Sequence, residues 1–84
     1  MKLVMCAVRD SAVDAFMRPF FVPSTGMAVR SFTDEVNRQD GEMNKHREDY
    51  ALFELGSFDE ESGKCFNLDT PRQLIRGSDI GERK

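Results

Sequence analysis

Two prolines that bracket an aromatic segment constrain the fold of this chain more than any other feature. Pro19 and Pro23 enclose the run Phe-Phe-Val, and each proline biases the residue before it towards extended backbone. The enclosed residues favour a β-strand, but a proline cannot donate to a sheet ladder, so a central strand is excluded. We therefore predict an edge strand or extended connector over residues 18–23. Phe20 and Phe21 should point to opposite sides, and the sequence leaves open which one is exposed.

A helix is predicted immediately after this segment, over residues 26–38. Ser24 or Thr25 can cap its first turn. Apolar residues then recur at helical spacing and form one stripe, made of Ala28, Val29, Phe32 and Val36. A helix with one apolar face should pack against a sheet.

The remaining apolar runs read as strands. Residues 2–9 are rich in Leu, Val and Met and lack a helix-start signal. Residues 50–58 and 64–68 form a predicted hairpin joined by residues 59–63, and Pro71 is expected to end its second strand. Strict alternation would place Phe53 and Phe58 on opposite faces. Residues 39–49 are polar and are predicted to form a loop with a helical turn.

These elements predict an α+β fold: a small, mostly antiparallel sheet with one main helix packed on one face and a C-terminal hairpin. We expect a single domain over residues 1–80 and a frayed tail at residues 81–84. An 84-residue chain buries only about two-thirds of its unfolded surface. The second face of the sheet would then carry leftover apolar residues, so we expect a homodimer.

Composition excludes several classes. The net charge is −3, with 12 basic and 15 acidic residues, which is not the balance of a strongly basic nucleic-acid binder. The two cysteines, Cys6 and Cys65, are too few for a disulfide-stapled domain, and each is expected to pack as a small buried apolar residue. The apolar run at residues 3–8 is too short for a signal peptide or a membrane span, so we predict no membrane partner and a cytoplasmic location.

No pattern of catalytic or metal-binding residues is evident. His46 is the only histidine and lies in a polar run without a nucleophile at a recognisable spacing. The chain has three cysteine and histidine residues in total, fewer than a structural zinc site needs. The acidic segment at residues 59–61 lacks the spacing of a calcium loop. We therefore predict a protein that is not an enzyme and has no metal and no cofactor.

Weak binding of single-stranded DNA needs basic residues interleaved with aromatic ones on one surface. The best candidate set in this chain is Arg18, Phe20, Arg30, Lys45, His46 and Arg47. The same residues are also compatible with a solvated surface, and an acidic domain with an apolar face suits a protein-interaction role as well.

Three segments resemble a known family when taken together. They are "PFFVPSTGMAVRSFTDEVN", "NKHREDYALFELGSFDEESGK" and "LIRGSDI". The shared pattern is an aromatic-proline run, then "A-x-R-x-F-x-D-x-V-N", then "H-x-x-D-Y-x-L-F-x-L-G-x-F-D" and an acidic loop. The positions that match here are Ala28, Arg30, Phe32, Asp34, Val36, Asn37, His46, Asp49, Tyr50, Leu52, Phe53, Leu55, Gly56, Phe58 and Asp59. In this pattern the chain is similar to the small nonstructural protein of gokushoviruses, tailless single-stranded DNA phages of the Microviridae.

The resemblance implies a nonstructural protein of the infected cell that supports phage DNA synthesis or packaging, with single-stranded DNA binding as the suggested activity. It implies no catalytic residues. Two hypotheses follow. Direct DNA binding would bring Arg18, Arg30, Lys45 and Arg47 onto one face and depend steeply on salt. An adaptor that docks the phage replication initiator, the procapsid or a host replication protein would instead show an exposed apolar patch.

Overall fold

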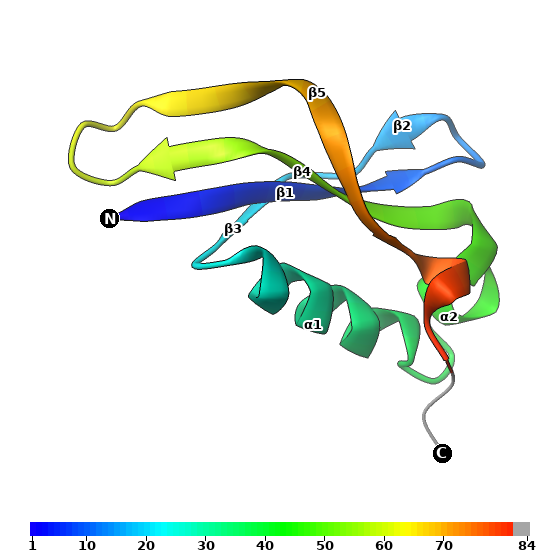
Figure 1. Ribbon diagram of the computed structural model, residues 1–84. Helices are drawn as coiled ribbons and strands as arrows, with labels where there is room; N and C mark the ends of the chain where they lie inside the picture. Colours follow the sequence, from blue (N-terminus) through cyan, green and yellow to red (C-terminus); the bar gives the residue numbers. More distant parts are fainter. Residues whose placement is uncertain (82–84) are drawn as a thin grey trace.

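A long strand, β1 (Lys2–Asp10), is the centre of the sheet in the computed structural model, which describes residues 1–81 (Figure 1). β4 (Tyr50–Asp59) runs antiparallel to β1 along its whole length, and β5 (Cys65–Arg76) lies outside β4. Two short strands, β2 (Ala15–Phe16) and β3 (Phe20–Val22), pair with the other side of β1. All pairs are antiparallel, so the predicted sheet type is confirmed.

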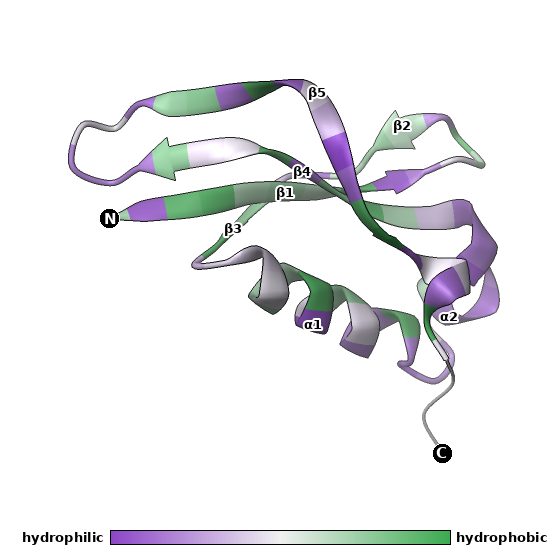
Figure 2. Cartoon of the chain, in the orientation of Figure 1, coloured by the Kyte–Doolittle hydropathy of each residue, from purple (hydrophilic) through white to green (hydrophobic). Residues whose placement is uncertain are grey.

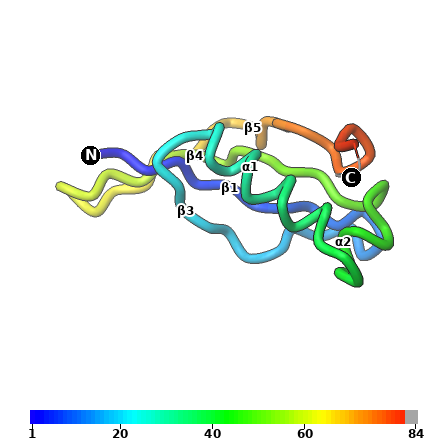
Figure 3. Tube along the Cα trace, turned by 90° about the horizontal axis from the view of Figure 1, so that it is seen from below, coloured from blue at the N-terminus to red at the C-terminus, as the bar shows by residue number. Residues whose placement is uncertain are grey.

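The main helix, α1 (Thr25–Val36), covers one face of this sheet. Ser24 caps it, because the Ser24 hydroxyl accepts a hydrogen bond from the Met27 amide at 3.3 Å. Viewed from below, α1 crosses the sheet beneath β1 and β4, while the connection between β2 and β3 swings outwards (Figure 3). The predicted α+β architecture, with one helix on one face, is thereby confirmed.

Short helical segments connect the larger elements. α2 (Glu42–Lys45) and the 3₁₀ turn η1 (Arg47–Asp49) link α1 to β4, and the 3₁₀ turn η2 (Gly77–Asp79) follows β5. The predicted helical turn within residues 39–49 is therefore present. Residues 82–84 of the predicted frayed tail lie outside the described residues.

The core lies between α1 and the sheet. Its buried side chains come from β1, α1, β4 and the segment after β5: Cys6, Val8, Ala28, Phe32, Val36, Leu52 and Ile80. In Figure 2, β1 is hydrophobic along most of its length, whereas the segment between α2 and β4 is hydrophilic. The helical stripe expected from the sequence supplies the three buried residues of α1.

A β-bulge corrects the predicted alternation in β4. Met5 pairs with Gly56 but Cys6 pairs with Glu54, so Leu55 is an extra residue opposite β1. The side chains beyond Leu55 therefore change face, and Phe58 joins the face that carries Phe53. The prediction that these two rings lie on opposite faces was wrong for this reason.

Two other expectations were wrong at β5. Pro71 does not end the strand, because β5 is at the edge of the sheet and its register with β4 shifts just before Arg72. Proline has no backbone N–H, but at this position no hydrogen bond between β5 and β4 is lost. Cys65 is exposed, not buried, because it opens this edge strand near the hairpin tip, whereas Cys6 is buried as expected.

Candidate functional site

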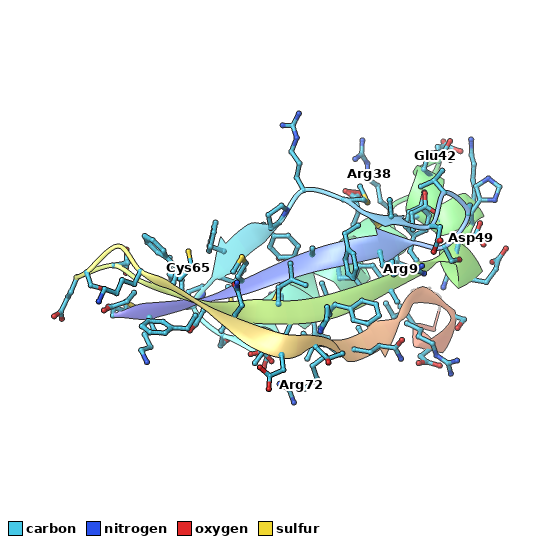
Figure 4. All side chains as sticks on the ribbon, turned by 90° about the horizontal axis from the view of Figure 1, so that it is seen from above. Arg9, Arg38, Glu42, Asp49, Cys65 and Arg72 are labelled. Atoms are coloured by element: carbon cyan, nitrogen blue, oxygen red, sulfur yellow. The ribbon has the colours of Figure 1, made fainter. Side chains whose placement is uncertain are left out.

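The sheet face opposite α1 carries four phenylalanines from three strands, β2, β3 and β4. They are Phe16, Phe21, Phe53 and Phe58, and we refer to the surface they form as the aromatic face. Strand register places them: Phe16 pairs with Arg9, Phe21 with Met5, Phe53 with Ala7 and Phe58 with Leu3. These β1 partners alternate with Cys6 and Val8, which point towards α1. Figure 4 shows this side of the sheet from above, with Arg9 towards the η1 end and Cys65 towards the hairpin end.

The four rings form two pairs that straddle β1. The centroids of Phe16 and Phe53 are 5.4 Å apart in an edge-to-face arrangement, and those of Phe21 and Phe58 are 5.7 Å apart in a tilted one. The two pairs are separated by about four residues of β1, which corresponds to about 13 Å. The aromatic face therefore presents two separate aromatic positions on one face of the sheet.

The outer ring of each pair remains accessible. Phe16 is 42% exposed and Phe21 is 47% exposed, whereas Phe53 and Phe58 are half-buried. Ala7, the cross-strand partner of Phe53 on β1, has no exposed surface. A small residue covered by larger neighbours lets the rings approach one another across the central strand, and their outer sides stay free to contact a ligand.

A hollow of about 180 Å³ lies beside Phe53. Arg9, Gln73 and Arg76 line it together with Phe53. Both guanidinium groups already have carboxylate partners: Arg9 donates to Asp14, and Arg76 donates to Asp79 at 3.2 Å. An anion at this position would compete with exposed carboxylates, so it would gain little from the two arginines.

A second surface lies on the other side of the sheet, between α1 and the connection from β2 to β3. This hollow of about 260 Å³ is named the α1 groove here; its lining includes Val8, Met17, Phe20, Phe32 and Met43. Arg18 and Glu35 also line it. The Met17 amide donates to the Val8 carbonyl at 2.7 Å, which fixes that wall to β1.

The six residues predicted to bind nucleic acid do not form one surface. Arg18 and Phe20 share the α1 groove, while Arg30 is exposed on α1 and does not line that groove. Lys45 and His46 are exposed at the end of α2. Phe20 is half-buried against the core, and Phe21 is the ring that faces outwards, which answers the question left open by the sequence.

Arg47, the sixth predicted residue, forms a contact within the protein. It is partly buried, and its Nη1 donates to the Ile80 carbonyl at 2.7 Å. Its Nη2 is buried and has no hydrogen-bond partner within residues 1–81. This contact ties η1 to the segment after β5 and keeps the side chain away from solvent.

The α2–η1 corner gathers carboxylates around His46. Its Nε2 is 4.0 Å from a Glu42 carboxylate oxygen. One ligand atom from each of His46, Glu48 and Asp49 lies within 4.8 Å of the others. These residues could hold a divalent cation, but His46 and Glu48 are exposed and would bind one weakly.

Two buried or shielded groups keep their protons more firmly than usual. Burial raises the pKa of the Cys6 thiol, with a further contribution from the Glu54 carboxylate. Burial also raises the pKa of Tyr50, and the carboxylates of Asp10, Glu42 and Asp49 add to this. Both groups therefore remain neutral at pH 7, and neither provides a nucleophile.

Comparison with known protein families identifies a match over nearly the whole chain. The family described as Phage ORF5 protein matches residues 3–80 of the chain. Neither the curated proteins nor the solved structures include a significant match. None of the helices within residues 1–81 is long and apolar enough to cross a membrane.

Proposed function

Because the chain belongs to the Phage ORF5 protein family, we propose that it is a gokushovirus nonstructural protein that supports single-stranded DNA synthesis or genome packaging in the host cytoplasm. It would act by weak binding of single-stranded DNA on the aromatic face. The observation that carries this proposal is the pair of accessible rings, Phe16 and Phe21, on one face of the sheet. Bases stack on such rings without sequence preference, at about 1–3 kcal/mol per base.

The proposed activity is not enzymatic. Phenylalanine side chains can stack against a base, but they cannot transfer a proton or attack a substrate. The two arginines that line the hollow beside Phe53, Arg9 and Arg76, are held by Asp14 and Asp79. These side chains can hold single-stranded DNA but offer no group that would cleave it.

Charge limits the strength of the proposed binding. The four cations predicted from the sequence are dispersed, and the cations that line the hollow beside Phe53 are Arg9 and Arg76. Two phosphate contacts give a log–log salt slope of about −1.4, whereas four contacts would give about −2.8. We therefore expect base stacking to dominate and the salt dependence to be shallow.

An adaptor function is the second candidate, and two observations favour it. The net charge of −3 opposes a polyanion, and the aromatic face is an exposed apolar patch of the kind that binds proteins. In this case the face would dock the phage replication initiator, the procapsid or a host replication protein.

Fluorescence anisotropy of a labelled oligothymidylate tests the DNA proposal. Raising the salt from about 50 to about 200 mM should weaken binding by less than about tenfold, because at most two phosphates are contacted. Phe16→Ser and Phe21→Ser should each weaken binding by about five- to a hundredfold, through loss of one stacking position. Near-UV and far-UV circular dichroism would verify that each variant is folded.

Arg30→Gln is the matched control, since Arg30 is exposed on α1 and away from the aromatic face. It should leave the affinity unchanged. A salt effect of about fiftyfold, together with loss of binding in Arg30→Gln, would return the site to the cations predicted from the sequence. Absence of binding at the lower salt concentration would leave the adaptor function.

A further inference from the structure

The lining of the α1 groove is held in place by core packing and by hydrogen bonds on two sides. Val8 and Phe32 are buried core residues that also line the groove. One wall is anchored by the bond from the Met17 amide to the Val8 carbonyl. The other includes Met43, whose neighbour Asn44 donates from its side chain to the Val36 carbonyl at 2.9 Å.

The size of the groove indicates a side chain as the occupant. Its volume of about 260 Å³ lies below the range of about 300–1,000 Å³ that small-molecule pockets usually have. The flexible thioethers of Met17 and Met43 line it together with the rings of Phe20 and Phe32. Methionine sulfur makes favourable contacts with aromatic rings and adapts to their shape. An aromatic side chain therefore fits this lining.

The charged residues at the groove indicate which group of a ligand should be next to its aromatic side chain. Among the described residues, Arg9, Arg38, Arg72 and Arg76 each have a carboxylate partner. Arg18 lines the groove and has no carboxylate partner within residues 1–81, and Glu35 on the α1 side is held by Arg38 at 3.4 Å. The groove thus offers one unpaired cation beside an apolar floor.

We propose that the α1 groove binds a segment of a partner protein in which an aromatic residue is next to an aspartate or glutamate. The ring enters between Met17 and Met43, and the carboxylate accepts hydrogen bonds from Arg18. This site is separate from the aromatic face, because the side chain of Val8 points to the opposite side of the sheet. The inference does not depend on DNA binding.

Two dipeptides, acetyl-Asp-Phe-amide and acetyl-Asn-Phe-amide, probe the groove by ¹H–¹⁵N NMR titration of the whole protein. The aspartyl probe should bind with a dissociation constant on the order of millimolar, as expected for a ligand of this size. It should shift the amide signals of Arg18, Ser31 and Glu35. The asparaginyl probe should bind about two- to fivefold more weakly, because it lacks an exposed ion pair.

Variants connect the result to the groove. Arg18→Gln should remove the difference between the two probes, and Arg30→Gln, the matched control on the exposed side of α1, should preserve it. Ser31→Phe should fill the groove and abolish the binding of both probes. Equal affinity for the two probes, or shifts centred on Phe16 and Phe21, would overturn the proposal. Phe21→Ser should leave probe binding unchanged even if it abolishes DNA binding, so the two proposals can fail separately.

Discussion

The requirement for glycine at position 56 shows how one residue sets the geometry of the sheet. A Cβ atom at Gly56 would lie far inside the contact distance of the Phe66 carbonyl oxygen, and 3.0 Å from the Cα of Asn67. Gly56→Ala should therefore lower the free energy of unfolding by about 1–3 kcal/mol or more, measured by urea denaturation. Gly81→Ala is the control, because nothing lies within 4 Å of its added Cβ, and it should change stability by less than about 0.5 kcal/mol. Equal effects of the two substitutions would contradict the close approach of β5 to Gly56.

The roles of single residues were predictable from the sequence where helical periodicity determines them. The cap at Ser24 and the buried face of α1 follow from local pattern alone. The bulge at Leu55 does not, because it depends on how β1 and β5 meet β4 from both sides. The contact of Arg47 with Ile80 joins residues 33 positions apart in the sequence, and no local signal distinguishes it from an exposed cation.

At the scale of elements, the tip of the β4–β5 hairpin is organised by one carboxylate. Asp59 accepts hydrogen bonds from the Ser62 hydroxyl at 2.8 Å and from the Glu61 amide at 3.3 Å. These bonds, that of Ser62 first, hold the pKa of Asp59 below its ordinary value. The stabilisation is present above the ordinary pKa of an aspartate and is lost as the pH falls through the lowered one.

Ser62→Ala tests this arrangement. Without the hydroxyl donor, the pKa of Asp59 should rise towards its ordinary value, which an NMR titration of the Asp59 carboxyl carbon would measure. Ser78→Ala, at an exposed serine in η2, should leave that pKa unchanged. If the Asp59 titration is the same in both variants, the hairpin tip is not held by this bond.

Elements with a clear periodic pattern were predictable, and elements that depend on pairing with distant residues were not. β1, α1 and the hairpin have enough periodic residues to be recognised, whereas β2 has two residues and depends on pairing with the end of β1. Pro71 is a strong local signal for a strand end, but the edge position of β5 overrides it. The aromatic face was predictable only in part. An apolar second face of the sheet was expected, but the bulge in β4 and the pairing of β2 determine which four rings form it.

For the whole molecule, the uncovered face predicts how the protein associates with itself. Phe16 and Phe21 expose roughly 180 Å² together, taking about 200 Å² per phenylalanine. A standard interface buries about 800 Å² on each partner, so these rings would supply only about a quarter of it. The homodimer predicted from the sequence should therefore be weak, with a dissociation constant in the micromolar range or above.

Sedimentation velocity over a concentration series measures this self-association. Phe21→Ser should shift the protein towards the monomer at every concentration, while Arg30→Gln should not. Because a second copy and a DNA strand would cover the same rings, oligothymidylate should dissociate the dimer if both use the aromatic face. A dimer that persists in Phe21→Ser and is unaffected by oligothymidylate would place the interface elsewhere and leave the aromatic face free for a different partner.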